Sequence, residues 1–325
     1  SLLAARAVGR IRNNLGLSLA LTTLFNFPTI AGLAQELNRQ SGGPATVPVA
    51  ASGVTSNAPL SWSQERLWFL DEFDPGSPAY NIPWAVRLKG TLKLQALQTA
   101  LNNLVERHIA LRTVFTATDD GPVQEVLNSI TVKPRVISGK DLSPDQLQVR
   151  LRHLSQEGFD LKHGPLLRVH IIHLAADDNV ILLTLHHIIA DNWSIGVLQK
   201  DLSALYNAAV TNTAADLPAP TLTCIDYAVW QRNTLNDSAL QEQLDYWKDR
   251  LAGAPALLEL PTDKPRPAVR TFNGSGESLM LDADLSAALQ KLANAEQCTL
   301  FMLLLAGFGV LLGRYSTSDD IVIGT

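Results

Sequence analysis

Two neighbouring histidines and an aspartate stand out in residues 186–194, HHIIADNWS. An imidazole with a pKa of about 6.5 can take or steer a proton near neutral pH. A carboxylate nearby can hold such a ring, pair with an arginine or cap a helix. By itself the stretch fits either an acid–base site or a pair of core histidines at the end of a strand.

The preceding residues predict how the two histidines are separated. Residues 179–185, NVILLTL, form a nearly continuous apolar run, which is typical of a central strand. Successive side chains on an extended chain point to opposite faces, so His186 and His187 cannot share one pocket. We expect one to be buried and the other to face a cavity. Asp191 comes just before a predicted helix that begins near Trp193.

Two other kinds of site can be drawn from the same residues. A metal centre needs a third or fourth ligand, and only two diverging histidines and one aspartate are local, so metal binding is not favoured. A triad of Ser194, His187 and Asp191 is possible by composition. Triad members normally come from separate loops, however, and the sequence has no G-x-S-x-G elbow.

The composition indicates a large folded protein. The chain has 325 residues, a length that suits two or three units. Of these residues 46% are apolar and 18% are charged, so a large core can be filled. The net charge is -5 and there is no basic stripe, which argues against a nucleic-acid partner. Its two cysteines lie far apart, as expected in a reducing cytoplasm. No signal peptide is visible, and the longest apolar run, 300–312, is too short for a bilayer. We therefore expect a cytoplasmic protein without membrane or nucleic-acid partners, and a buried core helix at 300–312.

The chain divides by composition into a short helical unit, a linker and a long unit. Residues 1–39 predict two or three short helices, too few for an independent core. Residues 40–59 are uncharged and rich in Gly, Pro, Ser, Ala and Thr, which is typical of a flexible linker. Residues 60–325 alternate helical and extended patterns and predict an α/β (α+β) fold. The chain lacks an initial Met and ends in an apolar strand-like run, so we expect a piece of a longer protein.

The long unit resembles the condensation domain of nonribosomal peptide synthetases. The resemblance rests on motifs in the family's order: LSWSQERLWFLDEFDPGSPAYNIP at 60–83, RHIALRTVF at 107–115, LHHIIADNWS at 185–194, CIDYAVWQR at 224–232, the 244–269 signature and GRYSTSDDIVIGT at 313–325. It implies a two-lobed fold like that of chloramphenicol acetyltransferase. Residues 60–235 would form the N-terminal lobe, and 236–325 an incomplete C-terminal lobe.

The short unit resembles the second part of a peptidyl carrier domain, a partial helical bundle. Residues 1–5, SLLAA, match the helix that follows the modified serine, and residues 24–34, LFNFPTIAGLA, match the last helix. The resemblance implies that Ser1 carries 4′-phosphopantetheine. The glycines that precede the serine in the family are absent, so an ordinary N-cap serine stays an alternative.

The resemblance implies amide bond formation, by attack of an acceptor aminoacyl amine on a donor thioester. It makes His186, His187 and Asp191 the active-site motif, with His187 as base or positioner. In the family the aspartate is structural and held by an arginine, here Arg66 or, alternatively, Arg314. Backbone N–H groups at the start of the following helix could face the oxyanion.

One residue departs from the active-site motif. Asn192 replaces the usual glycine. Glycine there suggests a positive φ, and asparagine is the next most tolerant residue, so we expect a left-handed turn at this position.

The same motifs bear on subtype and partners. HHIIAD argues against heterocyclisation relatives, which carry aspartates in place of the histidines, and the first motif favours an L-configured donor and an L-to-L enzyme. Donor and acceptor carrier domains and adjacent adenylation domains are the implied partners. The alternatives are a coenzyme A-dependent acyltransferase, against which the attached carrier argues, and a non-catalytic docking fragment. A chain cut in its second lobe can be inactive by itself.

Overall fold

The computed structural model describes residues 7–11, 19, 21–27, 29–39, 49–54, 56–235, 237–265, 267–268, 274, 276 and 278–324. The chain divides into two compact units. One comprises residues 49–240, and the other comprises 1–48 together with 241–325.

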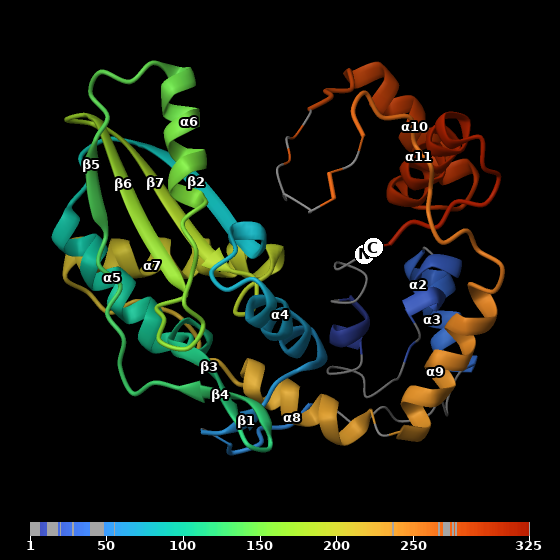
Figure 1. Cartoon of the computed structure of the whole chain (residues 1–325), viewed down its shortest axis with the longest axis horizontal. Helices are drawn as coiled ribbons and strands as arrows, with labels where there is room; N and C mark the ends of the chain where they lie inside the picture. Colours follow the sequence, from blue (N-terminus) through green and yellow to red (C-terminus); the bar gives the residue numbers. More distant parts are fainter. Residues whose placement is uncertain are drawn as a thin grey trace. The chain divides into compact units, whose positions relative to one another are not determined.

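A four-stranded sheet lies at the centre of the 49–240 unit (Figure 1). Its order is β2-β7-β6-β5, where β2 is Asn81–Lys89, β7 is Asp178–His186, β6 is Leu167–Ala175 and β5 is Arg135–Ser138. The first three strands are antiparallel, and β5 runs parallel to β6. Every residue of β7 is buried, which confirms the central strand predicted from the apolar run at 179–185.

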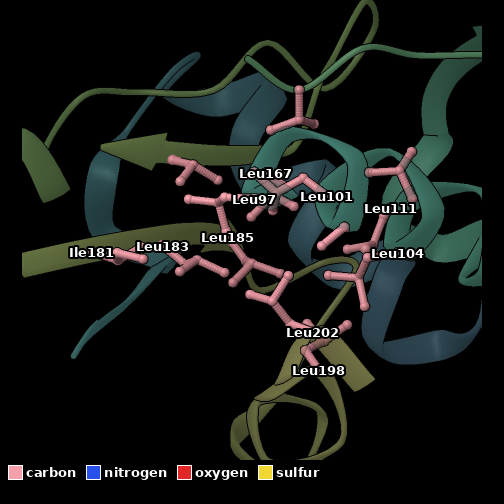
Figure 2. Close-up of a cluster of buried hydrophobic side chains, with 14 of the residues drawn as sticks. Leu97, Leu101, Leu104, Leu111, Leu167, Ile181, Leu183, Leu185, Leu198 and Leu202 are labelled. Atoms are coloured by element: carbon pink, nitrogen blue, oxygen red, sulfur yellow. The ribbon is translucent and has the colours of Figure 1, made fainter. Parts of the chain in front are cut away.

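Helices cover both faces of this sheet, and the alternation along β7 decides which side chain meets which helix (Figure 1). Ile181, Leu183 and Leu185 pack with the apolar faces of α5 (Leu94–Arg107) and α7 (Asn192–Thr211), as Figure 2 shows. Val180 and Leu182 pack instead with α6 (Pro144–Ser155). Each leucine buried in this way stabilises the fold by about 1.5–3 kcal/mol.

A second, three-stranded sheet of order β1-β4-β3 stands beside two further helices. The strands are β1 (Ala58–Pro59), β4 (Gly121–Val126) and β3 (Thr113–Thr118), and the helices are α4 (Trp62–Phe73) and α8 (Cys224–Thr234). Two short 3₁₀ helices, η1 (Pro78–Tyr80) and η2 (Ile109–Arg112), lead into β2 and β3.

Part of the stretch predicted as a linker belongs to this unit. Ala58 and Pro59 pair with β4, and the backbone N–H and hydroxyl of Ser52 donate to Asp226, at 2.6 and 2.8 Å. These contacts use backbone groups and one hydroxyl, so they need no apolar side chains, and composition alone does not predict them. Residues 40–48 lie outside the described residues.

The other unit is helical in its described part. It contains α2 (Leu21–Asn26), α3 (Ile30–Arg39), α10 (Ala283–Ala295) and α11 (Leu300–Ser316), and α9 (Asp237–Arg250) begins in the first unit. The helix predicted after Phe27 begins at Ile30, and Leu37 on its apolar face is buried.

The apolar run at 300–312 is helical, but it is not the buried core helix expected from its composition. None of the residues of α11 is buried, because among the described elements its main neighbour is α10. Among the described residues, no single helix has both the length and the apolar composition to span a membrane, although α10 and α11 pass as a pair bent by 102°.

Candidate active site

The end of β7 and the start of α7 present the histidine motif. The strand ends at His186, a turn covers residues 187–189, and α7 begins at Asn192. His186 is opposite Asn81, the first residue of β2. The backbone N–H of His187 donates to the carbonyl of Tyr80 at 2.8 Å. The backbone of His187 is therefore fixed by the end of β7 and by the residues at the start of β2.

His186 is a buried support of this turn. Its ring is 2% exposed and lies edge-on to Phe159, with 6.2 Å between ring centroids. Its Nδ1 accepts the backbone N–H of Ile188 at 3.1 Å. Burial, with a smaller contribution from the charge of His187, lowers the pKa of His186 to about 4. The ring is therefore neutral near pH 7 and holds the turn by accepting a hydrogen bond.

His187 faces a cavity of about 680 Å³. Its side chain is exposed, and among the described residues no hydrogen bond to its ring is found. The predicted division between one buried and one open histidine is thus confirmed. The other residues that line the cavity come from α4 and its cap, η1, the turn and the starts of α7 and α8: Ser61, Trp62, Ser63, Gln64, Arg66, Leu67, Tyr80, Ile188, Ile189, Ala190, Asp191, Ser194, Cys224 and Tyr227.

Asp191 caps the helix that follows the turn. Its Oδ1 accepts the backbone N–H of Ser194 at 2.8 Å and the Ser194 hydroxyl at 2.6 Å, while its own N–H donates to that hydroxyl oxygen. Burial raises the pKa of Asp191, but the hydrogen bonds from Ser194, together with the nearby His187, outweigh it and lower the pKa below its ordinary value. Asp191 is therefore an ionised cap that fixes the geometry after His187.

The cap bears on three ideas raised by the motif: an arginine partner for Asp191, a Ser194 triad and an oxyanion site at the start of α7. Among the described residues of the 49–240 unit, no ion pair or hydrogen bond joins Asp191 to the predicted partner Arg66, although Arg66 lines the same cavity. The alternative partner, Arg314, belongs to the other unit and stays a prediction. The Ser194 hydroxyl donates to Asp191, so Ser194 is not arranged as the nucleophile of a triad. The N–H groups of Ser194 and Ile195 also donate to Asp191, so these two are not free for an oxyanion; an oxyanion role for the N–H groups of Asn192 and Trp193 stays a prediction.

The prediction of a left-handed turn at Asn192 is wrong. Asp191 is extended, with φ of -130° and ψ of -177°, and Asn192 is already the first residue of α7. Among the described residues, the non-glycine positions with positive φ are Asn57, Asn212, Gln297 and Thr317. Helical backbone suits any residue with a side chain, so asparagine causes no strain at position 192.

A buried pair of amides behind the turn was not predicted. Gln64 and Gln124 are 8% and 0% exposed, and their amide groups face each other at 3.4 Å. Gln124 donates to the carbonyl of Pro59 at 2.8 Å, and the Gln64 side chain accepts the backbone N–H of Ser61 at 2.9 Å. The S-x-x-Q spacing of Ser61 and Gln64 is a capping-box signal that could have found half of the pair. No local pattern brings in Gln124.

Arg232 joins α8 to the start of α4. Its guanidinium pairs with Glu65, its Nε donates to the carbonyl of Leu60 at 2.7 Å, and it stacks 3.7 Å from the centroid of the Trp62 ring. The Trp62 N–H donates to Gln231 at 2.9 Å. These contacts hold the two helices that line one side of the cavity. More than 160 residues separate the partners, so no local pattern in the sequence signals them.

Ser1, the predicted attachment serine, lies outside the described residues. Among the described residues, no group of three or more His, Cys, Asp and Glu could hold a metal ion.

Family models match nearly the whole chain. A model described as Condensation domain matches residues 54–325, and one described as Phosphopantetheine attachment site matches residues 1–37.

Curated proteins with similar sequences are much longer than this chain. Malpinin synthetase of Mortierella alpina is 36% identical over 329 residues, which are 100% of this chain and 4% of that protein. Phosphinothricin tripeptide synthetase PhsC of Streptomyces viridochromogenes is 43% identical over 272 residues, which are 82% of this chain and 25% of that protein. One of the proteins that make up the linear gramicidin synthase of Brevibacillus parabrevis is 42% identical over 329 residues, which are 100% of this chain and 6% of that protein.

Solved structures share the fold. The X-domain from teicoplanin biosynthesis has a TM-score of 0.73 at 28% identity and covers 83% of this chain and 60% of its own. A four-domain nonribosomal peptide synthetase bound to AMP and glycine also has a TM-score of 0.73, at 27% identity, over 86% of this chain and 21% of its own. The first condensation domain of the calcium-dependent antibiotic synthetase, 19% identical with a TM-score of 0.70 over 81% of this chain and 62% of its own, agrees in fold. The predicted α/β fold like that of chloramphenicol acetyltransferase is confirmed.

Proposed function

The chain belongs to the condensation-domain family, and from that premise we propose that its cavity joins two carrier-bound amino acids by a peptide bond. The predicted order, a carrier segment ahead of a condensation domain, is confirmed by the matches at 1–37 and 54–325. The first match is a phosphopantetheine attachment site, so 4′-phosphopantetheine is the group that this segment carries. The open His187 in the cavity carries the proposal.

The reaction is attack of the acceptor's α-amine on the donor's thioester carbonyl. The nitrogen lone pair forms the C–N bond, the C–S bond breaks, and the sulfur leaves as a thiol after receiving the proton that the amine gives up. His187 is placed to take or steer that proton, because its ring is open to the cavity and its backbone is fixed by Tyr80. Holding the amine beside the carbonyl supplies much of the rate by itself.

His186 and Asp191 act by positioning His187. The neutral His186 ring folds the turn back on Ile188, and Asp191 fixes the start of α7. His186 can move little because it is buried, and Asp191 can move little because it accepts two hydrogen bonds from Ser194. A turn held at both ends keeps His187 in one orientation, which proton transfer requires.

The partners of this chain belong to the same proposal. Ser1 would carry the phosphopantetheine of the attached carrier segment, which its match to the family's modified serine supports. Donor and acceptor carriers would reach the cavity, adjacent adenylation domains would load them in the cytoplasm, and the joined residues would be L-configured. The similarity to peptide synthetases over the full chain supports this arrangement.

A docking role is the second candidate. The teicoplanin X-domain, 27% identical with a TM-score of 0.72, has been solved in a complex with OxyB. A domain of this fold can therefore bind a protein partner. An open histidine in a cavity is not needed for docking, so dependence of product on His187 separates the two roles.

The test is His187→Ala in the full synthetase that contains this chain. We expect product formation to fall by about 10²- to 10⁴-fold, because the proton has no acceptor, while circular dichroism and melting temperature stay unchanged. His153→Ala, at an exposed position of α6, is the matched control and should retain activity. Undiminished product from the His187 variant would refute the proposal, and product from coenzyme A thioesters alone would favour an acyltransferase.

A further inference from the structure

Trp62 gives the active-site cavity an aromatic wall. It is the first residue of α4, it lines the same cavity as His187, and its side chain is 42% exposed. An exposed indole in a concave site offers a large rigid apolar surface to a ligand, at little cost in side-chain entropy.

Contacts from α8 hold this indole in place. The Arg232 guanidinium lies 3.7 Å from the ring centroid, and the same group is fixed by the Leu60 carbonyl and by Glu65. Gln231 accepts the backbone N–H of Trp62 at 2.9 Å. A planar guanidinium held by two further partners is a preorganised stacking platform. Trp62 therefore presents a fixed surface to the cavity.

The neighbouring side chains that α8 adds to the cavity are also largely apolar. Tyr227 is 45% exposed, and Cys224 is half-buried; desolvation raises the pKa of the Cys224 thiol to about 11 and keeps it uncharged. The imidazole of His187 and the carboxylate of Asp191 come from the turn and from the N-cap of α7, and the guanidinium of Arg66 comes from α4, one turn after Trp62. The wall around Trp62 and α8 thus suits an apolar group, while the turn suits the reacting atoms.

We propose that Trp62, positioned by Arg232, is a specificity-determining residue that binds an apolar side chain of one of the two amino acids joined beside His187. The inference rests on the proposed function, and it adds which substrate chemistry the cavity selects. The side chain can belong to the donor or to the acceptor, and the test has an arm for each.

The first experiment measures kcat/KM of the full synthetase for matched thioester pairs. One arm varies the donor among alanyl, leucyl and phenylalanyl thioesters, and the other varies the acceptor. Trp62→Ala should lower the preference for the large apolar group over the alanyl group by about tenfold in one arm, as expected for lost apolar contact. Trp62→Phe should keep most of it. Phe73→Ala, on the same helix and 85% exposed, should leave the preference unchanged.

The second experiment tests the role of Arg232 through Trp62. Arg232→Gln should lower the same preference for the large apolar group. In the Trp62→Ala background it should not change that preference further, because Arg232 acts on the preference through Trp62. A purely structural role would instead reduce turnover of all thioesters equally, and the two effects would add.

The two hypotheses fail in different ways. A wild-type synthetase that forms no product with any pair refutes the proposed function and the inference with it. An active wild type whose side-chain preference survives Trp62→Ala in both arms refutes the inference alone.

Discussion

The buried neutral ring of His186 makes the stability of the 49–240 unit depend on pH. The ring has an ordinary pKa of 6.5 in the unfolded chain, and burial lowers the pKa to about 4 in the folded one. Between these values the unfolded state binds the proton and the folded state does not. The contribution of the neutral His186 ring to the free energy of unfolding is therefore fully present above about pH 6.5 and is lost as the pH falls toward 4.

The size of the effect follows from the shift in pKa. Each pKa unit corresponds to about 1.4 kcal/mol, so the full change in the free energy of unfolding across the range from pH 6.5 to 4 is about 3 kcal/mol. At pH 5 about nine in ten folded molecules still keep the ring neutral, while almost all unfolded chains are protonated. Lowering the pH from 8 to 5 should then cost about 2 kcal/mol of unfolding free energy through His186 alone.

Urea unfolding of wild type and His186→Gln at pH 8 and pH 5 isolates this contribution. Glutamine is neutral at both pH values, and its side-chain oxygen can accept the N–H of Ile188. Other titrating groups are common to both proteins and cancel in the difference. The wild type should lose about 2 kcal/mol more than the variant between the two pH values.

A matched variant guards against a general effect of losing a histidine. His153→Gln, at an exposed position of α6, should keep the wild-type pH dependence, because it leaves the buried His186 ring in place. If wild type and His186→Gln lost stability equally on acidification, the buried-ring argument would be wrong.

Two further predictions concern stability. Asp191→Ala should lower the free energy of unfolding by about 1 kcal/mol through loss of the helix cap, seen as a lower melting temperature; a fully stable but inactive variant would make Asp191 a chemical group instead. Gly158→Ala should destabilise by about 1–3 kcal/mol, because a Cβ there would overlap the backbone carbonyl oxygen of Gly76. Gly196→Ala, in α7 with nothing within 4 Å, should instead stabilise by about 0.5–1 kcal/mol, and equal effects of the two substitutions in denaturant titrations would contradict the packing described.

Local periodicity was enough to predict the strand and to predict that one of the two histidines is buried while the other is open; the family resemblance selected His187 as the reacting one. The apolar run at 179–185 became β7, and alternation along it placed His186 inside and left His187 at the cavity. Both depend on neighbours within a few residues, because the direction of a side chain on a strand follows from its position in the strand. The ordered motifs likewise predicted the family, since each is a continuous stretch.

Two predictions that assigned a hydrogen-bonding partner or a backbone conformation were wrong: Arg66 as the partner of Asp191, and a left-handed turn at Asn192. Asp191 caps the N-terminus of α7 and does not pair with Arg66, and Asn192 is the first helical residue of α7 and does not adopt a left-handed conformation. Several geometries are open to a short polar stretch, and local competition among hydrogen bonds decides between them.

What the tertiary structure alone decided is which distant residues share the site. The cavity combines side chains from α4, the turn after β7 and α8, and its supports include Gln124 behind Gln64 and Arg232 over Trp62. These pairs are 60 and about 170 residues apart, and their meeting depends on strand register and helix packing. The sequence by itself determined that one histidine of residues 186–194 is buried and the other open, because the alternation of side chains along a strand is local. Only folding determined what surrounds His187, because a cavity wall is made of contacts between elements far apart in the chain.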